Sequence, residues 1–216
     1  MKKALGFIIA ALVLIVLLFV TGTVYTVKEG QQVILTQFGK PIGDPITDAG
    51  FYFKLPFIVK VNVIEKRILA WDGKSVAMPT RDKTYIQVDT FARWKISNPL
   101  EYFKTLRDER SALSRLDDIL GSVTLNAVAK HDLLEVVRST KDRKSERTDL
   151  LTEKEAVFEP IKIGRREIEK NLKEIAKTKL NGTGIELLDL RFKRINYNQS
   201  VERQIYQQMI SERQKI

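Results

Sequence analysis

Residues 84–97 read TYIQVDTFARWKIS and carry the clearest secondary-structure signal in the chain. Five apolar side chains fall on even positions, and Gln87, Asp89, Arg93 and Lys95 lie between them. The apolar residues are Ile86, Val88, Ala92, Trp94 and Ile96. A period of two is typical of a half-buried β-strand. We therefore expect a strand here, ended by Asn98-Pro99 because proline cannot donate to the hydrogen-bond ladder.

Other strand patterns lie on both sides of this stretch. Residues 31–38, 51–55 and 57–69 are rich in strand formers, and valines at 59, 61 and 63 share one predicted face. Residues 185–195, IELLDLRFKRI, predict a further strand that opens after Gly184. Turns are predicted at Pro41, Gly43, Pro45 and Gly50.

Beyond Pro99 the apolar period becomes helical. One helix is predicted by Leu113, Leu116, Ile119, Leu120, Val123 and Ala127. Asp132 and Glu135 resemble a capping box for a short helix after His131. An amphipathic helix that ends near Lys179 is predicted by Ile168, Leu172, Ile175 and Ala176. The residues after the anchor therefore predict strands first, then helices and a last strand.

The N-terminal segment is the most apolar part of the chain. Residues 4–20 read ALGFIIAALVLIVLLFV, with only Gly6 outside the hydrophobic set. A helix from Ala4 to Tyr25 would be about 33 Å long, enough to cross a bilayer. We therefore expect a transmembrane anchor. The alternative is a cleaved signal peptide, for which Thr21-Gly22-Thr23 is a poor cleavage site.

Charge gives the expected orientation and a class of partner. Lys2 and Lys3 precede the apolar run, which favours a cytoplasmic N-terminus and places the rest of the chain outside the cytoplasm. The 216 residues include 37 Lys and Arg against 27 Asp and Glu, a net charge of +10. Such a surface suits anionic lipid headgroups, or is simply a solvated surface of mixed charge. Nucleic-acid binding is not expected, because no predicted helix clusters Arg with aromatic residues.

Residues for chemistry are scarce. The chain has no Cys and a single His, His131, which excludes thiolate chemistry, Cys-ligated metals and a histidine-rich metal site. Gly73-Lys74-Ser75 resembles the end of a phosphate loop, but the glycine needed five residues earlier is Ile68. We therefore expect no catalytic, cofactor-binding or metal-binding residues, and no enzymatic activity.

Two sets of residues are candidates for contacts instead. Membrane-proximal contacts are predicted for Phe51, Phe53, Pro56, Phe57 and Ile58, although core packing explains these residues equally well. An assembly interface is predicted for Leu113, Leu116, Leu120, Ile205, Met209 and Ile216. The last three belong to an apolar stripe along residues 198–216, which have no Gly or Pro. We expect the start of a coiled coil in a shortened chain; an ordinary packed helix is the alternative.

The order of several motifs resembles the band 7 (SPFH) superfamily of stomatins, prohibitins, flotillins and the bacterial HflK/HflC pair. The matching segments are 27–31 (VKEGQ), 38–40 (FGK) and 49–58 (AGFYFKLPFI). Within the superfamily the chain is most similar to the HflC family. That similarity is carried by 92–99 (ARWKISNP), 184–196 (GIELLDLRFKRIN), Tyr206 and Met209.

The resemblance implies a fold and a set of boundaries. It implies an α+β fold, in which a curved antiparallel sheet with packed helices is followed by a helical stalk. The implied segments are a cytoplasmic end at 1–3, an anchor at 4–26, a band 7 domain at 27–196 and the start of the stalk at 197–216. Residues 141–164 match poorly. Family members continue beyond the position of Ile216, and that further part closes the cage-like assembly that they form. Closure of such an assembly is therefore in doubt for this chain.

The resemblance also implies a function without chemistry. It implies a single-pass protein of the bacterial inner membrane with its main domain in the periplasm. Such a protein assembles with an HflK-like partner into a large hetero-oligomer that encloses and regulates the membrane AAA+ protease FtsH. The alternative is a stomatin-like scaffold that organises lipids for other clients. Stomatin-type anchors usually form a hairpin with a kinking proline, and none lies between Met1 and Pro41.

Overall fold

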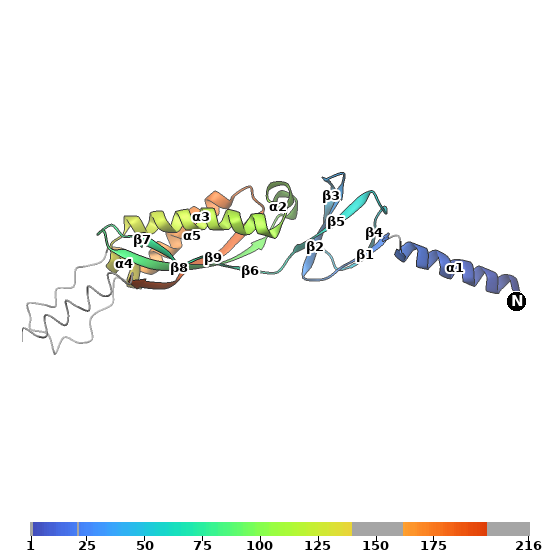
Figure 1. Cartoon of the computed structure of the whole chain (residues 1–216), viewed down its shortest axis with the longest axis horizontal. Coiled ribbons are helices and arrows are strands. Elements are labelled where there is room, and N and C mark those ends of the chain that lie inside the picture. Colours follow the sequence, from blue (N-terminus) through green and yellow to red (C-terminus); the bar gives the residue numbers. More distant parts are fainter. Residues whose placement is uncertain (1, 21, 140–161, 198–216) are drawn as a thin grey trace, which may run out of the picture. The chain divides into compact units, whose positions relative to one another are not determined.

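The structure is a computed structural model that describes residues 2–20, 22–139 and 162–197 (Figure 1). The chain forms two compact units, each built from separate stretches of sequence. The first unit holds the residues up to 68 together with 95–109 and 182–186, and the second holds 69–94, 110–181 and the residues from 187 onward.

Helix α1 spans Lys2–Val20 and precedes the strands of the first unit. Its side chains from Gly6 to Val16 are all exposed, and apart from Gly6 they are all apolar. No helix within the described residues is both long enough and apolar enough to span a membrane.

Two small antiparallel sheets make up most of the first unit. Strand β1 (Val24–Val27) pairs with β4 (Gly50–Phe53). The second sheet has the order β3-β2-β5. Its strands are β2 (Gln31–Gln37), β3 (Lys40–Ile46) and β5 (Val59–Glu65). The central strand β2 supplies buried Val33 and Ile34, which confirms the strand predicted over 31–38.

Strand β3 corrects the turns predicted from proline and glycine. Pro41, Gly43 and Pro45 all lie inside this strand. Proline is tolerated there because β3 is an edge strand, so the missing N–H is not needed for a second ladder. The pairing with β2 is also irregular between Val33 and Leu35, as expected beside such residues.

Strand β5 shows only part of the predicted face. Val63 is 54% exposed, whereas its neighbour Ile64 is buried. Asn62 turns toward β2, where its amide donates to Thr36 Oγ1 at 2.8 Å. A polar side chain with a partner inside the sheet therefore replaces the simple alternation of valines with polar residues.

A short helix begins directly after Asn98. Helix α2 (Pro99–Thr105) begins with proline, whose missing N–H costs nothing at the first helical position. The side chain of Asn98 caps it by accepting from the N–H groups of Leu100 and Glu101, both at 3.2 Å. Asn98-Pro99 therefore ends the strand, as predicted, and also starts a helix that was not predicted.

The second unit is built on one antiparallel sheet. Its longest strands are β8 (Tyr85–Ile96) and β9 (Ile185–Tyr197). The last two residues of β8 and the first two residues of β9 belong to the first unit. Strands β6 (Leu69–Asp72) and β7 (Val76–Pro79) pair with successive parts of β8, and β9 also pairs with β8. The even positions of β8 are buried, which confirms the predicted period of two.

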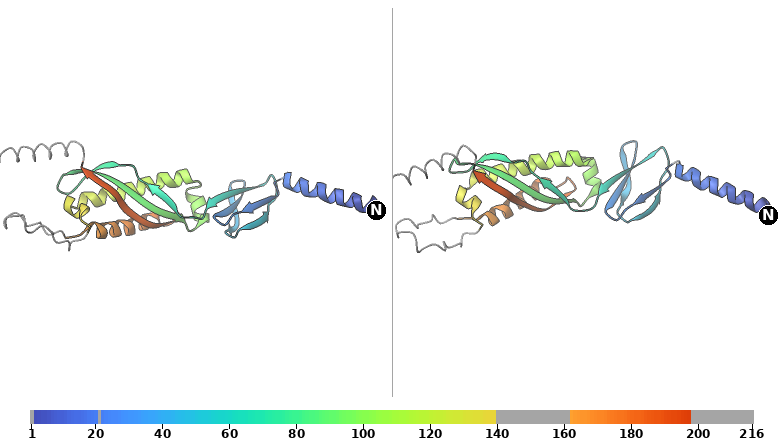
Figure 2. Two further views of the ribbon diagram at one scale, coloured as in Figure 1. Left: turned by 90° about the horizontal axis from the view of Figure 1, so that it is seen from below. Right: turned by 60° about the horizontal axis from the view of Figure 1, so that its bottom comes forward.

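Helices cover one face of this sheet (Figures 1 and 2). They are α3 (Glu109–Lys130) and α5 (Arg165–Leu180), with the short α4 (Leu133–Val137) after α3. Fully buried side chains of the resulting core include Trp94, Leu116, Leu120, Leu172, Leu187 and Leu190. Helix α5 is amphipathic as predicted, but Ile175 is 51% exposed.

Strand β9 pairs only with β8 among the described strands. Its backbone is nevertheless occupied at Phe192 by side chains of α5. The N–H of Phe192 donates to Glu169 Oε1 at 3.0 Å, and Arg165 donates to the Phe192 carbonyl oxygen. The Arg165 guanidinium also lies over the Phe192 ring, 5.7 Å from its centroid. A long strand at the border of the sheet is thus capped at this residue.

Candidate functional site

The described residues hold no constellation for metal binding. No group of three or more His, Cys, Asp or Glu side chains is placed to hold an ion in this part of the chain. His131 lies just after the end of α3, and its Nδ1 is 3.1 Å from Glu135 Oε2. The other oxygen of Glu135 accepts from the backbone N–H of Lys162 at 3.3 Å. The pair therefore joins three segments of the second unit.

The surroundings of His131 also correct the predicted capping box. Asp132 is the residue before α4, but its carboxylate makes no cap hydrogen bond. It pairs with Arg81 instead, whose Nε donates at 2.8 Å, and Arg81 lowers the Asp132 pKa. Burial alone would raise the pKa of Glu135, but hydrogen bonds from His131 and Lys162 lower it below the usual value. Both carboxylates are thus anionic structural partners.

Gly73-Lys74-Ser75 forms the connection between β6 and β7. The segment joins two strands, so it lacks the strand-to-helix context of a phosphate loop. Glycine is required at 73 because an added Cβ would lie 2.5 Å from the Trp71 ring and 2.7 Å from Thr90 Oγ1. The segment does not reverse the chain, because β6 and β7 pair with successive parts of β8.

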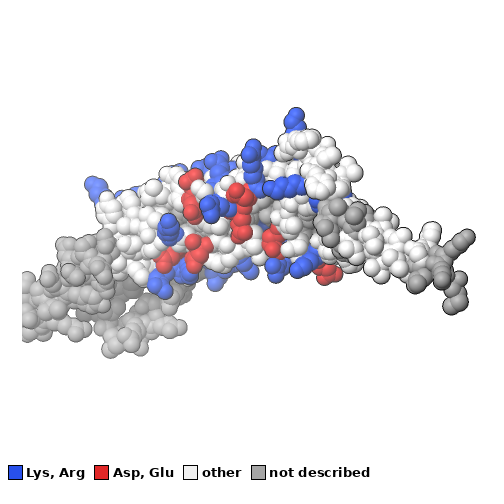
Figure 3. All heavy atoms as spheres, turned by 45° about the vertical axis from the view of Figure 1, so that its right-hand side comes forward, with Lys and Arg blue, Asp and Glu red and all other residues white. Residues whose placement is uncertain are grey.

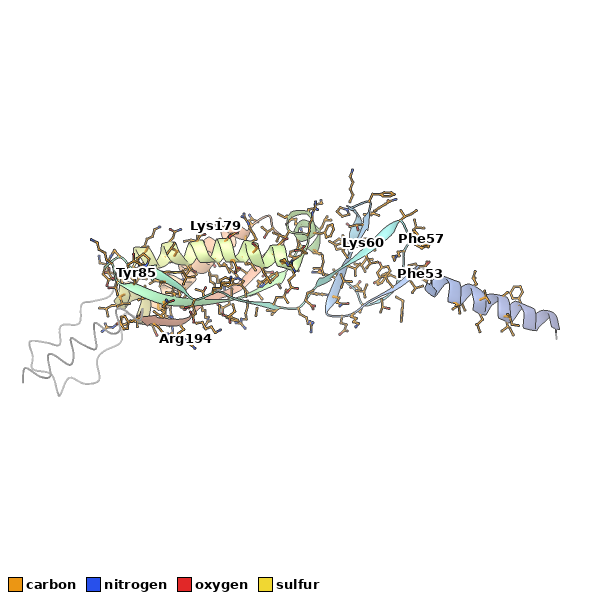
Figure 4. The ribbon with its side chains drawn as sticks, in the orientation of Figure 1. Phe53, Phe57, Lys60, Tyr85, Lys179 and Arg194 are labelled. Carbon is orange, nitrogen blue, oxygen red and sulfur yellow. The ribbon has the colours of Figure 1, made fainter. Side chains whose placement is uncertain are left out.

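A groove runs between α3 and α5, with a volume of about 670 Å³. Its floor is apolar, with Val123, Ile168 and Leu172 buried. Lys130 and Lys179 lie among its lining residues, and Figure 4 labels Lys179 on α5. His131 also lines the groove, but its described carboxylate partner, Glu135, is buried. Among the lining residues, His131 is therefore held by a structural partner.

The first unit carries the most unusual surface, which we call the apolar cluster. It consists of exposed side chains from the turn between β2 and β3, from strand β4 and from the connection between β4 and β5. The members are Phe38, Phe51, Phe53, Leu55, Phe57 and Ile58. Phe57 is 92%, Phe38 87% and Phe53 73% exposed. Monomeric proteins rarely leave several large rings so open, and such patches usually mark a binding surface.

Strand pairing brings the members of the cluster together. Gln37 pairs with Lys40 on one side and with Val59 on the other, so the Phe38-Gly39 turn lies beside the start of β5. The N–H of Val59 donates to the Leu55 carbonyl oxygen at 3.2 Å, which folds residues 55–58 back at the same strand end. Figure 4 shows Phe53 and Phe57 near this end.

The same strand end receives the chain from α1. Val24 pairs with Phe53, and the Lys54 N–H donates to the Thr23 carbonyl oxygen at 2.8 Å. Helix α1 ends at Val20, so only three residues separate it from β1. The apolar cluster is thus close in sequence and in strand pairing to the most apolar helix of the chain.

Two rings of the cluster have a backbone conformation that disfavours large side chains. Phe38 has φ of 49° and Phe57 has φ of 67°. The left-handed region costs a non-glycine residue about 1–2 kcal/mol. Both rings are exposed, so burial within the chain does not offset this cost. Strain combined with exposure points to a function outside the folded unit.

The sequence identified part of this cluster. Of the five predicted contact residues, Phe51, Phe53, Phe57 and Ile58 are exposed and Pro56 is half-buried. Phe38 and Leu55 were missed. For Phe38 a signal existed, because Phe38-Gly39 is a two-residue turn between strand patterns, and a turn side chain points to solvent.

The predicted assembly residues have different positions. Leu116 and Leu120 are completely buried against the sheet of the second unit, and Leu113 is half-buried. Ile205, Met209 and Ile216 lie outside the described residues. An interface on α3 stays a prediction, and its exposed surface would come from residues such as Leu125 rather than from Leu116 or Leu120.

Comparison with known proteins gives the family. The model of the SPFH domain / Band 7 family matches residues 25–216. Protein HflC of Borreliella burgdorferi is 34% identical over 211 residues, which covers 95% of this chain and 65% of that protein. Protein HflC of Treponema pallidum is 30% identical, covering 89% of this chain and 61% of that protein.

A third relative carries a functional name. The protein named "Modulator of FtsH protease HflC" of Escherichia coli K12 is 26% identical, covering 96% of this chain and 69% of that protein. The chain spans slightly less than two thirds of the two HflC proteins from Borreliella and Treponema. The family match and these relatives together show that the chain belongs to the SPFH domain / Band 7 family and is similar to HflC.

Proposed function

We propose that this protein is a non-enzymatic membrane scaffold that regulates an FtsH-like membrane protease in company with an HflK-like partner. The observation that carries the proposal is similarity over most of the chain to HflC proteins, one of which is named a modulator of FtsH.

Helix α1 is proposed as a single-pass anchor, with the N-terminus in the cytoplasm and the two units in the periplasm of a bacterial cell. Its exposed apolar side chains support this role. The apolar cluster, including Phe51, Phe53, Pro56, Phe57 and Ile58, is proposed to contact the same bilayer. Removing one exposed phenylalanine from water gains about 1.5–3 kcal/mol, enough to offset the backbone strain at Phe57.

Regulation is proposed to be steric. Neighbouring copies, each held by its anchor, would pack side by side and form a wall that limits which membrane substrates reach the protease. The exposed face of α3 and residues 198–216, with Ile205, Met209 and Ile216, are the proposed contacts between copies. Such an arrangement, together with an HflK-like partner, would form a large hetero-oligomer. The alternative function, organisation of lipids for other clients, would not require a protease.

The test is a mild-detergent purification of the tagged full chain from its own membrane, followed by mass spectrometry and sizing. We expect a very large particle that contains an HflK-like protein and an FtsH-like protease. A small species with neither partner would overturn the protease-scaffold proposal and favour lipid organisation. Peptidase activity of the purified chain without the protease would overturn the non-enzymatic role.

A pair of variants tests the assembly contacts. Ile205→Asp with Met209→Asp is expected to reduce the particle size while the tryptophan fluorescence of the second unit stays unchanged. The control is Ile175→Asp, an exposed isoleucine in the groove between α3 and α5, which is expected to leave the particle intact. Unchanged size in the double variant would remove residues 198–216 from the interface.

A further inference from the structure

We propose that Lys40, Lys54 and Lys60 form a cationic collar around the apolar cluster and make its bilayer contact selective for anionic phospholipids. The inference rests on the membrane contact proposed above and adds the class of lipid. It concerns the first unit alone, and it names residues to which the family resemblance assigns no role.

Strand register places the three lysines at the same strand end as the cluster. Lys40 pairs directly with Gln37, the residue before Phe38. Lys60 pairs with Thr36, one step farther along β2, and Figure 4 shows it beyond Phe57 on β5. Lys54 lies between Phe53 and Leu55, and its Nζ donates to the Val59 carbonyl oxygen at 3.1 Å. The apolar rings are thus bordered by ammonium groups.

Acidic residues are missing from the same segments. Residues 36–43 and 51–61, which form the cluster and its borders, contain no Asp or Glu. Within the described residues, none of the three lysines makes an ion pair. The opposite end of β2 and β5 differs, because Glu65 there pairs with Arg67 at 2.6 Å. On the face shown in Figure 3, acidic and basic side chains are likewise interspersed. Unbalanced positive charge therefore coincides with the exposed rings.

The arrangement fits a bilayer surface. Rings that enter the interface place the bordering ammonium groups at headgroup depth, because lysine stems lie along apolar surface while the charge stays in water. A lysine near an anionic surface strengthens binding about fivefold, and salt weakens the effect. Continuity with α1, three residues before β1, favours the bilayer over a soluble anionic partner.

The test uses the full chain reconstituted in vesicles. The chain has no Cys, so Gln37→Cys gives a single site for an environment-sensitive fluorophore beside the cluster. Vesicles contain phosphatidylcholine alone or with about one third phosphatidylglycerol, an anionic lipid. Spin-labelled lipid quenches the fluorophore when the cluster touches the bilayer. We expect stronger quenching in the anionic vesicles, with the difference reduced by salt.

Charge-neutral variants separate the lysines from the rings. Lys40→Gln with Lys60→Gln is expected to weaken contact with anionic vesicles about fivefold for each lysine, without effect in phosphatidylcholine. The matched control is Lys28→Gln, compared with Lys40→Gln or Lys60→Gln alone; it removes one charge just after Val27, at the opposite strand end, and is expected to change nothing. Lys54 is left in place because of its bond to Val59.

The possible failures differ. Equal quenching in both vesicles, unaffected by the lysine changes, would overturn the collar and leave the membrane contact standing. Absence of quenching in both vesicles would overturn the collar and the proposed membrane contact together. An equal loss in the control variant would show a general charge effect and would also overturn the collar.

Discussion

The second unit buries Phe192, whereas the apolar cluster of the first unit leaves its phenylalanines exposed. In the second unit, Phe192 is 3% exposed and Trp94 is fully buried beneath the helices. In the first unit, Phe57 and Phe38 are almost fully exposed. Both units rest on antiparallel strands, so strand formation does not explain the contrast. What differs is the cover over the sheet.

The cover follows from the helices that each unit contains. The second unit has α3 and α5, long amphipathic helices whose apolar sides close one face of the sheet. Besides α1, the described part of the first unit has α2, a helix of seven residues. Helix α2 packs against β2 and β3, and the apolar cluster stays exposed. Exposed phenylalanines in one unit are thus free for contacts, while the same residue type in the other unit holds the core.

Phenylalanine substitutions test the contrast between the two units most directly. Phe192→Ala is expected to lower the free energy of unfolding of the second unit by about 3–5 kcal/mol, because a buried ring leaves a cavity. Phe57→Ala is expected to change the first unit by no more than about 0.5 kcal/mol. Urea unfolding of the full chain in detergent measures both. Tryptophan fluorescence reports the second unit, which holds Trp71 and Trp94, and hydrogen exchange reports the first. Similar losses in the two variants would refute the contrast.

Two glycines of the first unit differ in the space that surrounds their backbone. Gly184 has φ of 73°, and an added Cβ would lie 2.5 Å from Tyr102 N and against the Asn98 carbonyl oxygen. Gly184→Ala is expected to cost about 3 kcal/mol or more, from strain and overpacking together. Gly182 has a similar φ of 77° but open space, so Gly182→Ala is expected to cost only about 1 kcal/mol. Hydrogen exchange in α2 measures the difference, and equal costs would show that space is irrelevant.

Charge in the second unit gives a smaller, pH-dependent effect. Burial would raise the pKa of Asp189, but hydrogen bonds from Arg191 and Arg93 lower it below the ordinary 3.8. A lowered pKa in the folded state stabilises the protein above the ordinary value, and this stabilisation is lost as pH falls through the lowered value. Asp189→Asn is expected to cost about 1 kcal/mol at neutral pH and to flatten the loss of stability below about pH 4. An unchanged acid limb in urea titrations would contradict this.

The smallest expected difference concerns two helix starts. Asn98→Ala is expected to destabilise the first unit by about 1 kcal/mol, because two backbone donors of α2 lose their acceptor. Asp132→Ala is expected to have less effect on α4, because Asp132 makes no cap bond and its pair with Arg81 is exposed. Hydrogen exchange at the first turns of α2 and α4 compares them. A larger loss at α4 would reverse the assignment.

The sequence predicted the second unit better than the first for a physical reason. Periods of two and 3.6 are produced by one covered face, and β8, α3 and α5 each have one. In β4 the run Phe51-Tyr52-Phe53 is apolar on both faces, so no pattern indicates which face is covered. Tyr52 turns inward, where its ring stacks on Tyr25 at 5.9 Å, and the two phenylalanines point out.

Proline caused the other misses. Pro41 and Pro45 indicate turns unless the strand is known to be an edge strand, which depends on pairing between distant residues. Pro99 ends one element and begins the next, so a single residue carried two signals. The lysines of the proposed collar were likewise invisible one at a time, since their common position depends on the register of β2 with β3 and β5.

The capped border of β9 has a consequence for a protein that would stand among many copies of itself. Unpaired edge strands on neighbouring copies can pair edge to edge, so that the sheets join into polymers of unlimited length. At Phe192 both backbone groups are already held by Arg165 and Glu169, so a foreign strand would first have to displace them. Side-chain contacts between neighbours can be undone one at a time, whereas fused sheets cannot, and the occupied Phe192 backbone therefore opposes irreversible fusion at this residue.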